Sequence, residues 1–433
     1  MSHVNFFSKP AESPDDVTVL LVAFTGTAAF NINGQTIHSA FSIFSTSLPY
    51  KPFGQDELNT LRIKYRSLQL LIIDEISMVD QNMLMYIHAR LQQIIRTSHT
   101  IPFGNVAVLA VGDFHQIPPV KGKPLFKQDP GSLADLWSLF PICNLETVMR
   151  QKEDIAFAQI LNRLRTHEKG QPIDPKDINV LESCIVSEIP NDAPFIAATR
   201  KQVELHNQKM LQYMNNIETI PAIDIYQTKC AVLKRLTKPS ASAKIVLPVE
   251  LSITEGARVI LTSNLVVSDG LVNGVTGKVT KIIHGNRPNG QPEAVCILFD
   301  ETRVGRQYRK QRPPPQNLDP ATIVLKPHKE IYSFNLHHIT RHQYPLKLAW
   351  ALTIHKVQGM TLKKVTVSLE GIFKAGMPYV ALSRVSSLQG LKMHGFQPRN
   401  IYCDTQVKNV LTLMLDCDVS CSNQLLHPSA NKL

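Results

Sequence analysis

The chain has 433 residues, which is more than one hydrophobic core usually holds, so its length favours two or three domains. Its hydrophobic fraction of 43% is enough for most of it to fold into packed cores. It contains no apolar run of about 18 residues or more, so the sequence predicts no membrane-spanning helix. The formal net charge is +11, and basic residues cluster at 229–238 and 303–312. Such clusters suit a polyanionic partner, although charge alone is equally compatible with solvated loops.

The seven cysteines are scattered along the chain and form no Cys-x-x-Cys pair. An odd number of isolated thiols is typical of a protein in a reducing compartment. We therefore expect a nuclear or cytosolic protein rather than a secreted one.

Three short apolar runs in the first part of the chain end on small or polar residues. They are residues 17–23 before Thr25-Gly26, residues 68–73 before Asp74-Glu75, and residues 106–111 before Gly112-Asp113. Residues 83–95 have helical spacing between the last two runs. Buried strands that alternate with helices predict a doubly wound α/β domain with ligands at the carboxyl ends of the strands.

A second group of apolar runs, at residues 195–198, 348–351 and 365–369, predicts another α/β domain. Residues 251–300 differ, because alternating strands are broken by Asn273-Gly274 and Asn289-Gly290, which is the pattern of an antiparallel β unit. Four prolines between Arg312 and Pro320 predict an exposed loop.

Asp74 and Glu75 follow a predicted buried strand, which would deliver both carboxylates to the edge of the sheet. A nucleoside triphosphatase needs one carboxylate near a phosphate-bound Mg²⁺ and a second to activate water. An acidic strand end is the ordinary alternative for this dipeptide alone.

Gln116 lies in the string Gly112-Asp113-Phe114-His115-Gln116 after the next strand, where it could bind a γ-phosphate or the attacking water. Gln358 and Gly359, in His355-Lys356-Val357-Gln358-Gly359, suit a loop that touches nucleotide and strand backbone. A polar surface turn is the alternative for each string.

Arg150 and Arg384 are candidates for arginine fingers, which stabilise charge on a transferring phosphoryl group. A surface salt bridge is the usual role of a lone arginine.

Thr25-Gly26 and Thr36 with His38 are small, hydroxylated or aromatic and could hold the phosphates and bases of a single strand. A core histidine is the alternative for His38.

In this order, the strings resemble the motifs of PIF-type DNA helicases of superfamily one, including the helicase part of Helitron transposons. The resemblance covers residues 17–391. It includes Asp74-Glu75-Ile76-Ser77-Met78, residues 112–120, Arg150-Gln151 with Asp154, Ala197-Ala198-Thr199-Arg200, Leu271-Val272-Asn273-Gly274, residues 345–361 and residues 379–391. A RecD-like helicase subunit would share the motor layout, but the insert string and the Arg150-Gln151 context favour the PIF type.

The resemblance implies an α/β fold with two RecA-like (P-loop NTPase) domains, the first incomplete, and an SH3-like β insert in the second. The predicted segments are 1–160 for the first RecA-like domain, 161–249 and 345–405 for the second, 250–344 for the insert with the Pro-rich loop, and 406–433 for a tail.

The resemblance also implies the use of ATP and Mg²⁺, and translocation in the 5′-to-3′ direction on single-stranded DNA. It implies a monomer that unwinds forked duplex or G-quadruplex DNA in repair, recombination or telomere maintenance, in the nucleus or in mitochondria. By motif, Asp74 would hold Mg²⁺, Glu75 would activate water, Gln116, Gln358 and Gly359 would contact nucleotide, and Arg150 and Arg384 would be fingers. The DNA-binding residues carried over are Thr25, Gly26, Thr36, His38, Thr199, His355 and Lys356.

One family feature has no counterpart in this sequence. The family begins with a strand, a loop ending in Gly-Lys-Ser/Thr (Walker A) and a helix, but no Gly-x-x-x-x-Gly-Lys string occurs here. Residues 1–16 are also shorter than a strand–loop–helix of about 25 residues. We expect a truncated first domain that is exposed on that side, and strongly weakened ATP binding. The rival hypothesis is a non-catalytic single-stranded-DNA-binding remnant of a transposon-derived helicase.

Overall fold

The computed structural model describes residues 16–44, 46, 50–120, 122–127, 136–145, 147–191, 193–226, 246–285, 291–334, 337–412 and 414. The basic cluster at 229–238, the turn Asn289-Gly290 and most of the predicted tail lie outside these residues. The chain divides into two compact units. Unit 1 comprises Met1–Phe24, Gly34–Ile189 and Gln358–Leu433, and unit 2 comprises Thr25–Asn33 and Pro190–Val357. The domain boundaries expected from the sequence stay a prediction.

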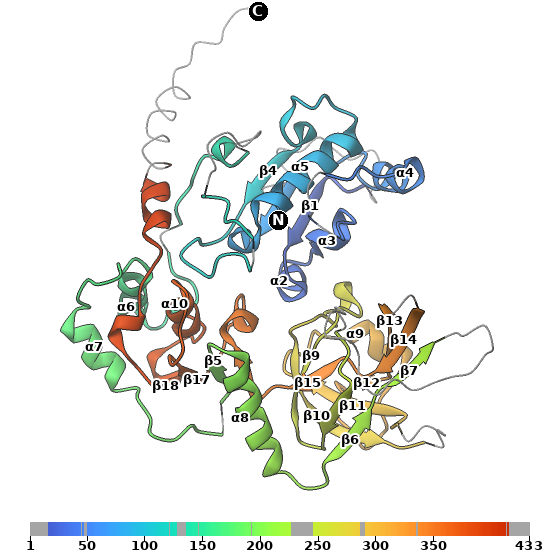
Figure 1. The fold of residues 1–433 in the computed structure, drawn as a ribbon, viewed down its shortest axis with the longest axis vertical. Helices are drawn as coiled ribbons and strands as arrows, with labels where there is room; N and C mark the ends of the chain where they lie inside the picture. Colours follow the sequence, from blue (N-terminus) through green and yellow to red (C-terminus); the bar gives the residue numbers. More distant parts are fainter. Residues whose placement is uncertain are drawn as a thin grey trace, which may run out of the picture. The chain divides into compact units, whose positions relative to one another are not determined.

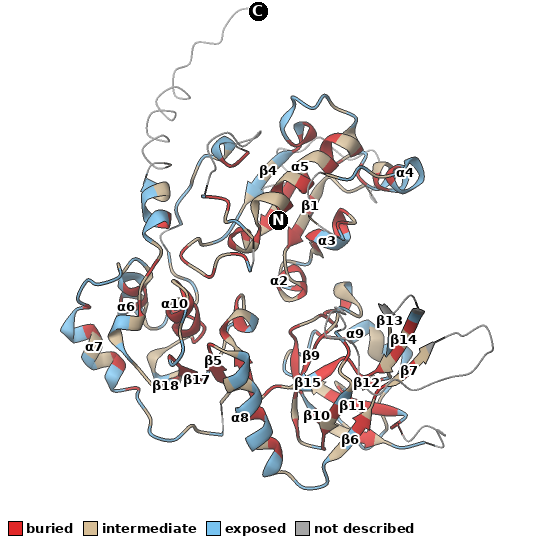
Figure 2. Cartoon of the chain, viewed as in Figure 1, coloured by how far each residue is buried: buried red, intermediate tan, exposed pale blue. Residues whose placement is uncertain are grey.

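Unit 1 contains a parallel sheet of the order β2-β1-β3-β4, as the three apolar runs predict. Its strands are β1 (Val19–Ala23), β2 (Gln35–Thr36), β3 (Leu70–Asp74) and β4 (Ala107–Ala110). The helix α5 (Gln81–Ile95) confirms the predicted helical spacing, and parts of it and of the sheet are buried (Figures 1 and 2). Its buried Ile87 and Leu91 belong to one core with Leu71 and Ile73 of β3. Two further helices of this part are α3 (Ile37–Ala40) and α4 (Gln55–Lys64).

β4 forms one edge of this sheet, and its residues are exposed or half-buried. Leu109 is 50% exposed, although it belongs to an apolar strand. Apolar side chains of a parallel strand are normally covered by helices. The exposed strand is thus the one that precedes the motif at residues 112–120, and its outer side carries no further strand among the described residues.

The rest of unit 1 brings together two segments that are far apart in sequence. The helices α6 (Ile155–Arg165) and α7 (Pro175–Glu182) belong to it, and so do α10 (Met377–Leu382) and the parallel pair of β17 (Val365–Ser368) and β18 (Leu391–His394). Contacts between α6 and α10 and the bridge from Ile185 to Met393 join these segments.

Unit 2 contains the predicted antiparallel β insert. Its main sheet has the order β12-β11-β10-β9-β15 and encloses an apolar core (Figure 1). The strands are β9 (Arg258–Leu261), β10 (Thr276–Ile283), β11 (Ala294–Phe299), β12 (Ile323–Leu325) and β15 (Leu346–Leu348). The Pro-rich segment 312–320 is exposed or half-buried, which confirms the predicted loop.

Two smaller antiparallel sheets also lie in unit 2: β13-β14-β7 and β6-β8. Their strands are β6 (Glu218–Pro221), β7 (Ile223–Tyr226), β8 (Glu250–Ile253), β13 (His328–Phe334) and β14 (His337–Gln343). The short basic helix α9 (Arg306–Gln311) and the helix α2 (Gly26–Asn31) also lie in unit 2.

The prediction of one strand over residues 348–351 is wrong. The structure has two strands there: β15 ends at Leu348 and pairs with β9, whereas β16 (Ala351–Thr353) pairs in parallel with β5 (Phe195–Ala197). The chain changes partners at this point because the amide of Ala349 donates to the carbonyl of Arg258, while the amide of Ala351 donates to Asn207. Asn207 belongs to the helix α8 (Arg200–Gln212), which follows β5.

Among the described residues, no helix has the length and apolarity that a membrane span requires.

Candidate functional site

Asp74 ends β3, and Glu75 follows it in a left-handed backbone conformation with φ 52° and ψ 47°. Such a conformation is strained for a residue that has a side chain, and it occurs often at functional sites. Burial and the neighbouring Asp74 raise the pKa of the Glu75 carboxyl, while Arg384 and Arg150 act in the opposite direction. The buried Oε2 atom of Glu75 has no hydrogen-bond partner among the described residues. Glu75 is thus a half-buried carboxylate whose buried Oε2 atom is a free acceptor, and two arginines lie nearby.

Gly112 follows β4 and lies against the residue after Glu75. A Cβ atom at Gly112 would be 2.9 Å from the backbone nitrogen of Ile76, so a side chain there would separate the two strand ends. The turn that follows leaves Oε1 of Gln116 and Nδ1 of His115 buried without a partner among the described residues. Burial lowers the pKa of His115 to about 4, so this imidazole is neutral at pH 7. The turn therefore presents neutral polar groups, which bind without adding charge.

Arg150 and Arg384 come from distant parts of the sequence and lie in one place. The Arg150 side chain donates to Oγ1 of Thr361 at 3.0 Å and to the carbonyl of Ser383 at 3.3 Å. Arg384 is 1% exposed and donates to the carbonyl of Val380 at 2.8 Å. Burial, followed by repulsion from Arg150, lowers the pKa of Arg384 to about 10. Two guanidinium groups thus repel each other in a buried site, where a bound anion would stabilise both.

Gln358 and Gly359 lie next to the same carboxylate. The Gln358 amide donates to Oγ of Ser77 at 3.4 Å, and a Cβ atom at Gly359 would be 3.5 Å from Oε1 of Glu75. Gly359 has φ +82°, a conformation that glycine adopts without strain. The backbone can therefore approach Glu75 closely at this point.

The turn of Gln116 also belongs to this neighbourhood. A Cβ atom at Gly376, which caps α10, would be 2.5 Å from the carbonyl oxygen of His115 and 3.0 Å from that of Gln116. The structure thus gathers Asp74, Glu75, Gln116, Arg150, Gln358, Gly359 and Arg384 in unit 1. We call this group the carboxylate–arginine cluster.

The cluster fits a Mg²⁺-bound triphosphate. Glu75 and Gln116 offer unused acceptors, and the two mutually repelling arginines offer positive charge. Mg²⁺ is commonly held by one or two carboxylates together with substrate phosphates, and Asp74 supplies such a carboxylate. Among the described residues, no group of three or more potential ligands forms a metal site from protein atoms alone. A Mg²⁺ ion at Asp74 would complete its coordination with phosphate oxygens and water.

Sequence reasoning missed several residues that build the cluster. Asp113 forms an ion pair with Arg165 at 2.8 Å, and desolvation of the half-buried Tyr379 raises the pKa of its hydroxyl to about 12. Gln151 donates to the carbonyls of Ser383 and Val385 at 3.2 and 2.7 Å. The position of Asp113 after a strand was a usable signal, whereas Arg165 near the end of a helix offered none.

The predicted DNA-binding residues are divided between the units. In unit 1, Thr36 caps α3 by accepting from the amide of Ser39, and His38 is exposed with its ring edge-to-face against Phe24 at 5.4 Å. Because His38 is exposed, the alternative of a core histidine is wrong. In unit 2, Thr25 caps α2, and Thr199 caps α8 in a capping box with Gln202.

The remaining predicted DNA-binding residues of unit 2 are Gly26, His355 and Lys356. His355 and Lys356 lie in the 3-10 turn Ile354–Val357, and the Lys356 ammonium donates to Oδ1 of Asn273 at 2.7 Å. Gly26, the first residue of α2, packs against Asn264 and Val272. The contacts of Gly26 and Lys356 are thus both made to residues 264–273 of the insert.

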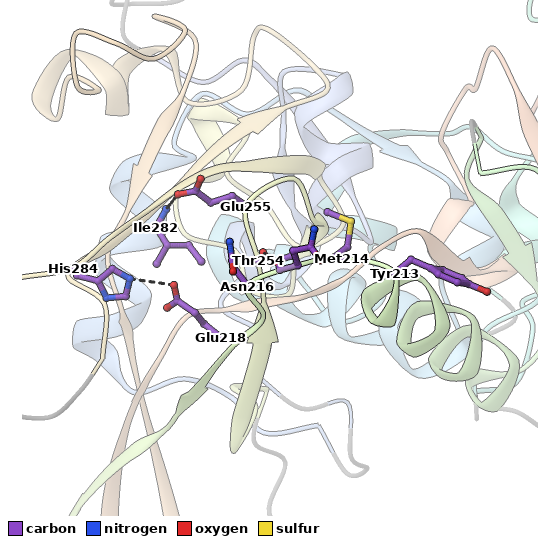
Figure 3. Close-up of a pocket in the computed structure, with 9 residues that line it drawn as sticks. Tyr213, Met214, Asn216, Glu218, Thr254, Glu255, Ile282 and His284 are labelled. Carbon is purple, nitrogen blue, oxygen red and sulfur yellow. Dashed lines mark hydrogen bonds and ion pairs between the residues drawn. The ribbon is translucent and has the colours of Figure 1, made fainter.

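A separate pocket of about 510 Å³ lies in unit 2 beyond the end of α8 (Figure 3). A hydrogen bond of 3.1 Å joins His284 to Glu218 in its wall, and Tyr213 and Thr254 also line it. It contains none of the predicted site residues, so we assign it no part in the chemistry of the cluster.

Comparisons with known proteins agree with the motif order. Residues 10–168 match the family model described as PIF1-like helicase. The ATP-dependent DNA helicase PIF1 of Danio rerio is 32% identical over 394 residues, which cover 89% of this chain and 55% of that protein. The chain therefore spans about half the length of the curated relatives it matches.

Two solved structures resemble nearly the whole chain. The Pif1 helicase from Candida albicans has a TM-score of 0.69 and 26% sequence identity, with 94% of this chain and 90% of that chain covered. Bacteroides Pif1 bound to single-stranded DNA has a TM-score of 0.68 and 25% identity, with 93% and 88% covered. These matches confirm the predicted α/β fold with RecA-like domains.

Proposed function

We propose that this chain is a member of the PIF1-like helicase family and carries the hydrolytic residues and the strand-binding residues of an ATP-dependent DNA helicase. The observation that carries the proposal is the carboxylate–arginine cluster, in which Glu75, Arg150 and Arg384 influence one another's ionisation. Buried groups with perturbed pKa values that gather around one point are typical of active sites.

Each residue of the cluster has a role that its surroundings support. A raised pKa makes Glu75 a better proton acceptor, so its carboxylate would take a proton from the attacking water. Arg150 and Arg384 would stabilise charge that develops on the phosphoryl oxygens, while Gln116 and Gln358 orient water and phosphate. Bound Mg²⁺, held by Asp74, would neutralise charge on the phosphates.

The substrate would be single-stranded DNA, along which the motor translocates in the 5′-to-3′ direction. Thr25, Gly26, Thr36, His38, Thr199, His355 and Lys356 would contact the strand. Unwinding of forked duplex or G-quadruplex DNA by a monomer would serve repair, recombination or telomere maintenance in the nucleus or in mitochondria. Support for the substrate comes from the resemblance to Bacteroides Pif1, whose structure was solved with single-stranded DNA.

A second candidate is a single-stranded-DNA-binding protein that has no motor activity. It applies to residues 1–433 taken by themselves, which contain no Gly-x-x-x-x-Gly-Lys string. The carboxylate–arginine cluster favours the motor, because strand binding alone does not need such a cluster. Its polar residues are Asp74, Glu75, Gln116, Arg150, Gln358 and Arg384.

Filter binding to labelled oligothymidylate distinguishes the two candidates. For the motor, we expect Mg·ATP, titrated well above its own weak dissociation constant, to change the affinity for the oligonucleotide, because nucleotide and strand binding are coupled in a motor. The variant Arg384→Ala should retain binding without nucleotide and lose the response to ATP. An affinity that depends on salt but is identical with and without ATP would contradict the motor and favour the second candidate.

A further inference from the structure

The segment between β9 and β10, residues 264–274, forms a compact loop of the β insert. Its ends approach each other because the amide of Leu265 donates to the carbonyl of Leu271 and the amide of Leu271 donates to the carbonyl of Val266. The side chain of Asn264 accepts a hydrogen bond from the amide of Asn273 at 2.8 Å. We call residues 264–274 the insert loop, and these bonds fix the position of Asn273 within it.

One side of the insert loop packs against α2. A Cβ atom at Gly26 would be 2.5 Å from Oδ1 of Asn264, and a Cβ atom at Gly270 would be 2.5 Å from the Phe30 ring. The guanidinium of Arg303 lies over the same Phe30 ring, 5.1 Å from its centre. The loop therefore packs directly against the helix that Thr25 and Gly26 begin.

The other contact of the insert loop is with Lys356. The side-chain oxygen of Asn273, whose backbone Asn264 already holds, accepts the hydrogen bond from the Lys356 ammonium at 2.7 Å. Asn273 is a neutral acceptor, so it can fix the direction of the ammonium group without neutralising its charge. A carboxylate at the same place would fix the direction of the ammonium group and also neutralise its charge.

The charge around Lys356 is positive. Partial desolvation, followed by repulsion from Lys347 and Arg200, lowers the pKa of Lys356. Within the described part of the chain, no carboxylate forms an ion pair with this lysine. A lysine that is held by a neutral acceptor and repelled by two further cations favours the approach of a phosphate backbone.

We propose that Asn273 is a positioning residue for strand binding: it holds the Lys356 ammonium toward a phosphate of single-stranded DNA, and the insert loop thereby links the Lys356 turn to α2. This inference rests on the proposed function, because it requires the chain to bind single-stranded DNA. It adds a residue of the β insert to the contacts that the motifs predict. Asn273 acts through Lys356 and need not touch the strand itself.

The test is a double-mutant cycle in oligothymidylate binding without nucleotide, measured at several salt concentrations. We expect Asn273→Ala to weaken binding roughly three- to tenfold, as the loss of one positioning hydrogen bond allows. Lys356→Ala should weaken binding and reduce the slope of log affinity against log salt by about 0.7. In the Lys356→Ala background, Asn273→Ala should have no further effect.

Asn273→Asp gives an independent readout with almost unchanged shape. Its carboxylate would pair with Lys356 and repel the strand, so we expect weaker binding than for Asn273→Ala and a smaller salt slope. Asn317→Ala, an exposed asparagine of the same insert, is the matched control and should bind like the wild type. Thermal unfolding of each variant checks that the fold is retained.

Two outcomes separate the failure of this inference from the failure of the proposed function. Additive effects of Asn273→Ala and Lys356→Ala, or an Asn273→Asp variant that binds like the wild type, would overturn the positioning role alone. A wild-type chain that does not bind oligothymidylate at any salt concentration would overturn the proposed function, and this inference with it.

Discussion

We expect the dissociation constant of the 433-residue polypeptide for Mg·ATP to lie several orders of magnitude above the micromolar range. The reason is that no Gly-x-x-x-x-Gly-Lys string is present to surround the phosphates with backbone amides and a lysine. Each charge-assisted hydrogen bond of that kind contributes about 1.5–3 kcal/mol, so the loss of two lowers affinity by roughly 10²–10⁴-fold. The measurement is an equilibrium titration with fluorescently labelled ATP.

The control is the same polypeptide extended before Val17 by a strand, a loop ending in Gly-Lys-Ser and a helix. The extension should restore affinity toward the micromolar range, and Arg384→Ala in the extended polypeptide should reduce it again. Micromolar binding by the unextended polypeptide would show that the carboxylate–arginine cluster binds nucleotide without such a loop, which is contrary to our expectation.

The second large effect concerns stability rather than nucleotide. Arg341 and Asp224 form an ion pair at 2.6 Å in which each side chain is only 1% exposed. Tyr332 donates to the same carboxylate, and Arg341 also donates to the carbonyl of Leu247. We expect Arg341→Met to destabilise unit 2 by about 3–5 kcal/mol, because it leaves the Asp224 carboxylate buried without its counter-charge.

Urea unfolding measures this effect most cleanly in a Trp137→Phe background. The chain has two tryptophans, and the remaining one, Trp350, packs against the apolar core of unit 2, so its fluorescence reports on that unit. The double variant Arg341→Met, Asp224→Leu should recover much of the loss, since an apolar pair can replace a buried ion pair. Glu301→Gln, which weakens the exposed pair with Arg303 in the same unit, should cost less than about 1 kcal/mol. A similar cost for Arg341→Met would contradict our account.

Much of the architecture follows from local sequence pattern. Apolar runs bounded by glycine and acidic residues predicted β1, β3 and β4 to within a few residues, and alternation with Asn-Gly turns predicted the antiparallel insert. Both patterns are local in sequence. The apolar runs reflect strands that are buried on two faces, and the Asn-Gly pairs reflect the geometry of tight turns. The same logic placed Asp74 and Glu75 at the end of a central strand.

The finer construction of the site depends on contacts that no local pattern encodes. Gln151 and Arg150 meet Ser383 across more than 230 positions of the chain, and Arg165 meets Asp113 from a different element. The left-handed conformation of Glu75 is likewise imposed by surrounding structure, because a glutamate does not favour it. The packing of α2 against the insert loop depends on the absence of side chains at Gly26 and Gly270, which matters only once the two segments meet.

The most direct test of the central claim is a crystal structure of the chain grown with Mg²⁺ and ADP–aluminium fluoride at concentrations that overcome weak affinity. The claim is that the carboxylate–arginine cluster surrounds one nucleotide phosphate group. We predict that the fluoride complex contacts Arg150, Arg384 and Gln358, with Mg²⁺ beside Asp74 and a water bound to Glu75. A nucleotide bound elsewhere, with Arg150 and Arg384 still bonded only to Thr361, Ser383 and Val380, would contradict it.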